Sequence, residues 1–140
     1  MQNAQGAELY LSEEVCALNK YRLKYRKTDD ARFISHLDFV RTITRTFRRA
    51  NLAVKYSQGF NPHMIMTVAL PISVGVISDA EYMEIEFTED VPCGEIVSRL
   101  NENIPLGLII TDARKVSETD TPLSKIAYAK YLVNVEHRGN

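Results

Sequence analysis

Apolar residues change their spacing near residue 30, and this change limits the possible folds more than any other feature of the sequence. From Lys20 to Thr28 apolar and basic residues alternate, a pattern typical of a half-buried strand. The inward residues of this strand are expected to be Tyr21, Leu23 and Tyr25. From His36 to Ala50 apolar residues recur every three or four positions, which predicts an amphipathic helix. Its buried stripe is expected to contain Leu37, Val40, Ile43, Phe47 and Ala50.

The predicted helix has a start signal and a basic solvent face. Ser35 offers a hydroxyl N-cap, and Asp38 follows three residues later, as in a capping box with Asp in place of the usual Glu. Four arginines lie off the apolar stripe: Arg41, Arg45 and Arg48 share one face, and Arg49 lies on its flank. The helix is therefore expected to present a strongly basic surface to solvent.

Downstream, the pattern predicts three more strands and a second helix. The strands are expected at Met64–Leu70, Glu81–Thr88 and Leu106–Val116, and the short helix begins at Pro92-Cys93-Gly94 and stops before Pro105. In the third strand, alternation places Met83, Ile85 and Phe87 inward and Tyr82, Glu84 and Glu86 outward. The element order β-α-β-β-α-β predicts an α+β fold, a ferredoxin-like split βαβ sandwich with both helices on one face of the sheet.

Two flanking segments complete the expected organisation. Residues 1–19 are polar and acidic and are expected to be a flexible or loosely helical lead-in to a ferredoxin-like domain at 20–116. Residues 117–124 have the composition of a polar loop, and Ile126–Val135 is expected to be an additional C-terminal strand. Residues 117–140 therefore look like the start of a truncated second half.

The net charge of −1 conceals an uneven distribution of charge along the chain. Between Lys20 and Lys55 eleven lysines and arginines stand against three aspartates, a surplus of eight, so the remainder carries −9. Such segregation favours an anionic partner. In the expected fold the first and third strands are neighbours, which would set Arg22, Lys24 and Arg26 beside Glu84 and Glu86. The basic excess without acidic neighbours then lies on the helix and the loop that follows it.

The composition argues against several functional classes. The sequence has no run of about 18 apolar residues and no signal-peptide pattern, so we expect a cytoplasmic protein without a membrane span. Cys16 and Cys93 are far apart and belong to no CxxC pair, so a zinc or iron–sulfur site built by this chain alone is not expected. No Gly-rich phosphate loop, Ser/His/Asp spacing or metal-ligand cluster indicates catalysis, and no cofactor is expected.

The residues most typical of a binding site run from the helix into the following loop. Arginine engages phosphate in bidentate fashion, and a phosphate backbone would relieve the repulsion within an arginine stripe. The loop adds aromatic rings for stacking on bases and polar groups for hydrogen bonds, a mixture suited to single-stranded or loop RNA. The candidate nucleic-acid or partner-binding residues are Arg32, His36, Arg41, Arg45, Arg48, Arg49, Lys55, Tyr56, Ser57, Gln58, Phe60, Asn61 and His63.

Other interpretations of these residues stay open. The arginines could form an ordinary solvated helix face, and the loop could be a tight connection in which Phe60 packs inside. His36 and His63 could act as acid and base on a phosphodiester, as in a metal-independent ferredoxin-like endoribonuclease. By alternation, Glu84 and Glu86 fit a solvated strand face. Together with Glu89 and Asp90 they could in principle hold a metal.

Four motifs carry a resemblance to a known family. They are Arg32-Phe33-Ile34-Ser35-His36-Leu37-Asp38, Arg48-Arg49-Ala50, Tyr56-Ser57-Gln58-Gly59-Phe60-Asn61-Pro62-His63 and Ala80-Glu81-Tyr82, with the spacing continued through Leu70-Pro71 and Gly75. In these motifs the chain, over about residues 20–135, resembles the bacterial radical SAM-linked, or radical SAM-associated, protein family, a domain of unknown function. Its members look like partners of radical S-adenosylmethionine enzymes, fused to one or encoded beside one, often near a gene for a ribonuclease of the E/G type.

The resemblance implies a non-catalytic accessory module in RNA or ribosome-linked modification, with a radical SAM enzyme as its expected partner. A protein-interaction subunit that docks on the enzyme without binding RNA is the alternative from another class. The chain lacks a CxxxCxxC motif, so it cannot itself hold the radical enzyme's iron–sulfur cluster. Two departures stand out: members usually carry a proline and a basic residue where Met64 and Ile65 follow His63, and they generally extend well beyond 140 residues.

Overall fold

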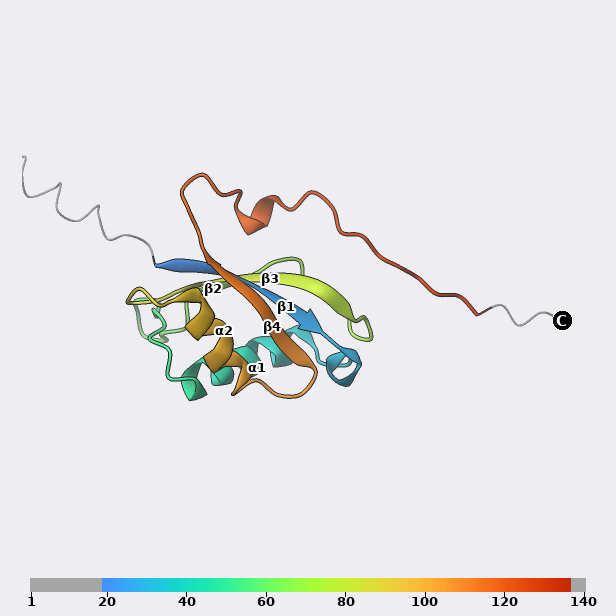
Figure 1. Cartoon of the computed structure of the whole chain (residues 1–140), viewed down its shortest axis with the longest axis horizontal. Coiled ribbons are helices and arrows are strands. Elements are labelled where there is room, and N and C mark those ends of the chain that lie inside the picture. Colours follow the sequence, from blue (N-terminus) through green and yellow to red (C-terminus); the bar gives the residue numbers. More distant parts are fainter. Residues whose placement is uncertain (1–18, 137–140) are drawn as a thin grey trace, which may run out of the picture.

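Four strands and two helices make up residues 19–136, the part of the chain that the computed structural model describes (Figure 1). The strands are β1 (Lys20–Lys27), β2 (Met66–Val68), β3 (Ser78–Glu86) and β4 (Leu108–Lys115), and the helices are α1 (His36–Arg49) and α2 (Cys93–Asn101). The predicted order of these six elements is confirmed. Residues 1–18, which make up nearly all of the predicted lead-in, lie outside the described residues. No helix of residues 19–136 is long and apolar enough to cross a membrane.

The four strands form one antiparallel sheet in the order β2-β3-β1-β4, and both helices lie on the same face of it (Figure 1). The register places Leu23 of β1 opposite Met83 of β3 on one side and Ala113 of β4 on the other. The predicted α+β class and the predicted pairing of the first strand with the third are therefore confirmed.

The core lies between the sheet and the two helices. The predicted inward residues of the first and third strands are all buried: Tyr21, Leu23, Tyr25, Met83, Ile85 and Phe87. The helices contribute Phe39, Ile43, Phe47, Ile96 and Leu100. The rings of Tyr25 and Phe39 stack with centroids 5.0 Å apart, and Phe87 meets Tyr21 edge-on at 5.2 Å. These aromatic contacts join β1, α1 and the end of β3 into one apolar layer.

α1 begins where predicted but buries a different stripe. Ser35 is the N-cap, and its hydroxyl accepts a hydrogen bond from the backbone N–H three residues later at 3.2 Å. The prediction that Leu37 is buried is wrong, because its side chain is 66% exposed and Phe39 occupies the core instead. Thr46 is also buried, with its hydroxyl bonded to a carbonyl of the preceding turn. The stacking of Phe39 on Tyr25 sets the rotation of the helix, and helical spacing alone does not reveal that contact.

The second strand is shorter and less buried than predicted. Expected over Met64–Leu70, it is limited to Met66–Val68, with a separate bridge between Tyr56 and Met64. Its residues are partly buried or exposed rather than buried throughout. Within residues 19–136, β2 is an edge strand that pairs with β3 and has no strand on its other side.

The outward face of the sheet is not fully solvated, contrary to the prediction for Glu84. Glu84 is only 3% exposed. Lys20 Nζ lies 2.8 Å from one of its carboxylate oxygens, and Arg22 Nε donates to the other at 2.9 Å. Arg22 also donates to the Thr121 carbonyl at 2.7 Å, and Leu123 is buried. The segment after β4 therefore covers this ion cluster.

The remaining outward charges pair only partly as predicted. Arg26 of β1 pairs with Asp79 at 2.9 Å. Glu86 pairs with Lys55 at 3.3 Å rather than with a basic residue of β1, and Lys24 has no ion pair among residues 19–136. β3 thus neutralises the first strand mainly through Glu84 and Asp79.

The additional strand expected at Ile126–Val135 is not formed. After the 3-10 turn η2 (Leu123–Lys125), residues 126–136 pair with no strand of the described sheet. Figure 1 shows η2 on the sheet face opposite the helices and the following segment running beyond the sheet. The prediction was wrong because alternating β-forming residues form a strand only beside a strand edge, and after η2 the chain lies over a face of the sheet.

Gly107 allows the loop before β4 to approach the turn before α1. Its φ is +94°, and a Cβ there would lie 2.6 Å from the backbone nitrogen of Ala31. We expect Gly107→Ala to lower the free energy of unfolding by about 1–3 kcal/mol through backbone strain, with the clash in addition. Urea unfolding measures this loss, and Gly94→Ala is the matched control. A Cβ at Gly94 in α2 meets open space, so this control should gain about 0.5–1 kcal/mol. An unchanged midpoint for Gly107→Ala contradicts the prediction.

Candidate functional site

The predicted basic surface of the helix is confirmed. Arg41, Arg45 and Arg48 are exposed on the side of α1 away from the sheet and lie within an arc of about 60°, at roughly 100° per residue. Arg41 pairs with Asp38 at 3.2 Å, whereas Arg45 has no ion pair or hydrogen bond with any residue in 19–136. Arg49 is exposed on the flank and donates to a backbone carbonyl just after α2 at 2.7 Å. We call these four arginines the arginine face.

The loop from Ser57 to His63 closes on itself. The Ser57 N–H donates to the His63 carbonyl at 2.8 Å, and the His63 N–H donates to the Ser57 hydroxyl at 3.1 Å. The ring Nδ1 of His63 lies 3.0 Å from the same hydroxyl. Phe60 is fully exposed at the turn, so the interpretation in which it packs inside is wrong. Gln58 and Asn61 beside it are also exposed.

Tyr56 joins the loop to the arginine face. Its hydroxyl lies 3.4 Å from Arg48 Nε, near the last turn of α1. Lys55 is exposed next to it and pairs with Glu86 at 3.3 Å. We call the combination of the arginine face, Lys55, Tyr56 and the loop Ser57–His63 the helix–loop surface. The helix–loop surface therefore contains eleven of the thirteen candidate residues in one continuous region.

Arg32 and His36 lie apart from this surface. His36 is the first residue of α1, about 18 Å along the helix axis from Arg48. Arg32 pairs with Asp29 at 2.8 Å and lies 4.6 Å over the ring of Phe33. Because the loop is joined to the opposite end of α1, the structure does not bring His36 and His63 together. The arrangement needed for a histidine acid–base pair is therefore not assembled.

The sequence pattern did not predict a buried titratable cluster near His36. Lys27 is only 4% exposed, and its Nζ donates to the Ile34 carbonyl at 3.1 Å. Burial lowers the pKa of Lys27, and burial raises the pKa of Glu81 although Ser78 donates a hydrogen bond to it at 2.6 Å. The signal was available, because Lys27 continues the inward alternation of β1.

The cluster beneath His36 supports the start of α1 rather than forming a substrate site. Lys27 and His36 line a cleft of about 20 Å³, which has room for about one water molecule. The hydrogen bond from Lys27 to Ile34 fixes the backbone that leads into the N-cap of the helix. We therefore assign this cluster a positioning role.

The acidic residues proposed as an alternative metal site do not converge. Glu84 is occupied by Lys20 and Arg22, and Asp90 accepts hydrogen bonds from Lys115 and Tyr21. The bonds from Lys115 and then Tyr21 hold the pKa of Asp90 below its usual value. Within residues 19–136 no group of three or more His, Cys, Asp or Glu side chains could hold a metal ion.

Comparison with known proteins identifies a family without a described activity. Residues 20–140 match the family model described as "Uncharacterized protein conserved in bacteria (DUF2344)". No curated protein matches the chain. The function is therefore inferred from the geometry of the helix–loop surface.

Proposed function

The chain belongs to the DUF2344 family of uncharacterized proteins conserved in bacteria, and from this premise we propose that it is an accessory module that binds RNA through the helix–loop surface. The observation that carries the proposal is the contact between Arg48 and Tyr56. It makes the arginine face continuous with a loop that exposes an aromatic ring.

The charge of the arginine face supports a polyanionic ligand. Arg45 lies four residues from both Arg41 and Arg49 and three from Arg48, and like charges at these spacings repel one another by about 0.2–0.5 kcal/mol per pair. Arg41 alone among the four has a carboxylate partner within residues 19–136, and that pair is exposed to solvent. Phosphates would remove the repulsion and match the donor geometry of the guanidinium groups.

The loop supports a ligand with accessible bases. Phe60 offers an exposed ring for stacking, while Gln58 and Asn61 offer amide donors and acceptors. The Ser57 hydroxyl engages Nδ1 of His63, so that its Nε2 is free to meet a base or a phosphate. Bases in a duplex are stacked on one another, so we propose single-stranded or loop RNA as the ligand class.

The proposal also includes the fold type and the enzyme partner. The strand order β2-β3-β1-β4 with both helices on one face supports a ferredoxin-like split βαβ unit. The resemblance of the motifs to radical SAM-linked proteins supports a radical SAM enzyme as partner. In that case the enzyme supplies the iron–sulfur chemistry and this chain positions the RNA.

A protein-interaction subunit without RNA affinity is the second candidate. Phe33 and Leu37 are exposed apolar residues beside His36 at the start of α1, and apolar side chains grouped on a surface favour a protein partner. Copurification with a radical SAM enzyme after nuclease treatment, together with no measurable RNA affinity, would support this candidate and remove the first.

The direct experiment is a titration of labelled single-stranded RNA with the chain at several salt concentrations. The expected result is binding whose affinity falls steeply with salt, because each neutralised phosphate releases counterions. A duplex of the same length should bind more weakly. Absence of binding at low salt would refute the proposal.

Replacing Phe60 tests the loop. We expect Phe60→Ala to weaken RNA binding by about 1–3 kcal/mol, the contribution of one stacked base, without changing the unfolding midpoint, because the ring is fully exposed. Tyr128→Ala is the control, since Tyr128 is an exposed aromatic residue outside the helix–loop surface. Fluorescence anisotropy measures both affinities, and equal losses in the two variants would exclude a specific role for the loop.

A further inference from the structure

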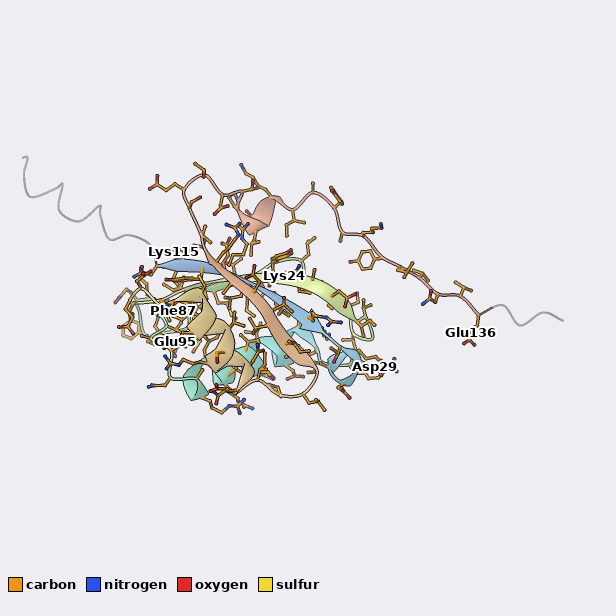
Figure 2. The ribbon with its side chains drawn as sticks, in the orientation of Figure 1. Lys24, Asp29, Phe87, Glu95, Lys115 and Glu136 are labelled. Carbon is orange, nitrogen blue, oxygen red and sulfur yellow. The ribbon has the colours of Figure 1, made fainter. Side chains whose placement is uncertain are left out.

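The segment Tyr128–Val135, here called the tail strand, has the composition of a strand but no partner. Its large apolar side chains are between 64% and 91% exposed: Tyr128, Tyr131, Leu132, Val133 and Val135. Its backbone makes no hydrogen bond with residues 19–136. Figure 2 shows Glu136, which follows the tail strand, well away from the sheet. Several exposed β-forming residues in a row are typical of an interaction surface.

One edge of the sheet is protected against pairing. β4 lies at this edge, and the side chain of Asn101 covers its backbone at Ile110. The Asn101 amide donates to the Ile110 carbonyl at 2.8 Å and accepts from the Ile110 N–H at 2.9 Å. The next residues of β4 include the charged Asp112, Arg114 and Lys115. A plugged backbone and charged side chains are common ways to block strand addition.

The other edge is open only along β2 itself, Met66–Val68, because Met64 is already bridged to Tyr56 and the Ile65 N–H donates to the Lys55 carbonyl at 3.0 Å. The Ile65 carbonyl accepts from the Glu86 N–H, and the Ala69 N–H donates to the Tyr82 carbonyl, so these residues point toward β3. In an antiparallel ladder the residues between them turn their N–H and C=O groups the other way. Met66 and Val68 therefore present their backbone groups at the free edge, where no described residue bonds to them. No charged residue occurs from Met64 to Leu70.

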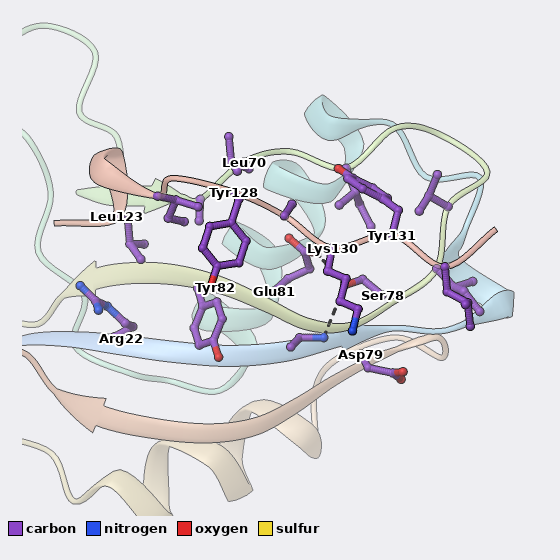
Figure 3. Close-up of a pocket in the computed structure, with 18 of the residues that line it drawn as sticks. Arg22, Leu70, Ser78, Asp79, Glu81, Tyr82, Leu123, Tyr128, Lys130 and Tyr131 are labelled. Atoms are coloured by element: carbon purple, nitrogen blue, oxygen red, sulfur yellow. Dashed lines mark hydrogen bonds between the residues drawn. The ribbon is translucent and has the colours of Figure 1, made fainter. Parts of the chain in front are cut away.

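The tail strand does not pair with this edge in its own chain. Leu123 is buried, and Arg22 and Arg114 hold the preceding residues through Thr121 and Asp120 at 2.7 and 2.8 Å. From this anchor the chain passes a groove of about 900 Å³. Figure 3 shows Tyr128 near Tyr82 and Tyr131 farther along, toward the Ser78 end of β3.

The position of the tail strand relative to β2 follows from the antiparallel pairing of β2 with β3. The start of β3, at Ser78, lies past the last residue of β2. One wall of the groove contains Leu70, Ile72 and Ile77 from the connection between the two strands, and the tail strand itself forms another wall; residues of β2 do not line it. The tail strand has therefore already passed the free edge of β2 when its apolar residues begin.

We infer that the tail strand of one chain pairs with the free edge of β2 in a second copy of the chain, so that two copies exchange tails. Each copy carries both an unpaired strand and an open edge, which makes the exchange self-complementary about a two-fold axis. Both segments lack charge where they meet, since Tyr131–Val135 and Met64–Leu70 contain no charged residue. Backbone hydrogen bonds across the new ladder supply the association, as in other strand additions.

The test combines the mass of the particle in solution with hydrogen exchange of backbone amides. Light scattering should show a monomer that converts to a dimer as concentration rises. In the dimer, the amides of Met66 and Val68 and alternate amides of the tail strand should become protected. Successive N–H groups of a strand point to opposite sides, so Leu132→Pro or Val133→Pro must remove a bond of the ladder.

Proline and isoleucine substitutions in the tail strand provide the decisive comparison. At least one proline variant should remain monomeric and lose protection at Met66 and Val68, while Leu132→Ile and Val133→Ile should still dimerise. Both sites of substitution are exposed, so folding of the monomer is not at stake. The inference is overturned by a chain that stays monomeric at all concentrations, by a dimer that both proline variants still form, or by a monomer whose tail amides are already protected.

Discussion

A chain carrying Arg41→Glu, Arg45→Glu and Arg48→Glu is expected to bind single-stranded RNA on the order of a hundredfold more weakly at about 50 mM salt. The three guanidinium groups are exposed on one side of α1, so their replacement removes about three phosphate contacts. For a single strand each contact contributes about 0.7 to the slope of log affinity against log salt, so the slope should fall by about 2. Anisotropy titrations at several salt concentrations measure both quantities.

The control for this variant must change the net charge equally at another place. Arg26, Lys125 and Lys130 are exposed and lie outside the helix–loop surface, and their joint replacement by glutamate also shifts the charge by six units. We expect the control to lose affinity modestly through long-range repulsion while keeping most of the salt slope. Equal losses in the two variants would show that only net charge matters, and an unchanged slope in the first would eliminate the arginine face as the RNA contact.

The second large effect is expected on stability, at Glu84. Its carboxylate is buried between Lys20 and Arg22, so Glu84→Ala leaves two cations without their partner. Breaking a buried ion pair in this way costs about 3–5 kcal/mol of the free energy of unfolding. Glu86→Ala is the matched control on the same strand, because its partner Lys55 is half exposed and such a pair contributes about 1 kcal/mol or less. Urea unfolding distinguishes the two, and equal losses would contradict the prediction.

The same residue should make stability depend on pH. Burial raises the pKa of Glu84, but hydrogen bonds and charge from Lys20 and Arg22 outweigh it, so the net pKa lies below its ordinary value. Its contribution is therefore complete above the unfolded pKa, near about 4.3, and is lost as the pH falls through the lower pKa of the folded state. Glu84→Gln should reduce the loss of the free energy of unfolding at acidic pH. An unchanged loss would assign the effect to other carboxylates.

The regular elements could be predicted because their signals are local. Alternation in β1 and in the third strand identified inward residues such as Leu23 and Met83, and the cap at Ser35 located the start of α1. These signals depend only on the period of the backbone and on hydrogen bonds within a few residues.

The failures share a different cause, which is contact between distant parts of the chain. Leu37 is exposed because Phe39 stacks on Tyr25 of another element. Glu84 is buried because the chain beyond β4 returns over the sheet. Alternation in Ile126–Val135 predicted a strand that is not formed, because a strand also requires an edge to pair with, and residues 126–136 lie beside neither edge of the described sheet.

For the candidate site, the sequence by itself determined which groups are present: a basic helix face and a loop with aromatic and amide side chains, whose exposure only the structure shows. Only the tertiary structure decided which of them act together. The packing of α1 across the sheet joins Arg48 to Tyr56 and leaves Arg32 and His36 at the opposite end of the helix. The physical reason is that helical spacing specifies direction around one axis, whereas the distance between a helix and a loop depends on how the whole core packs.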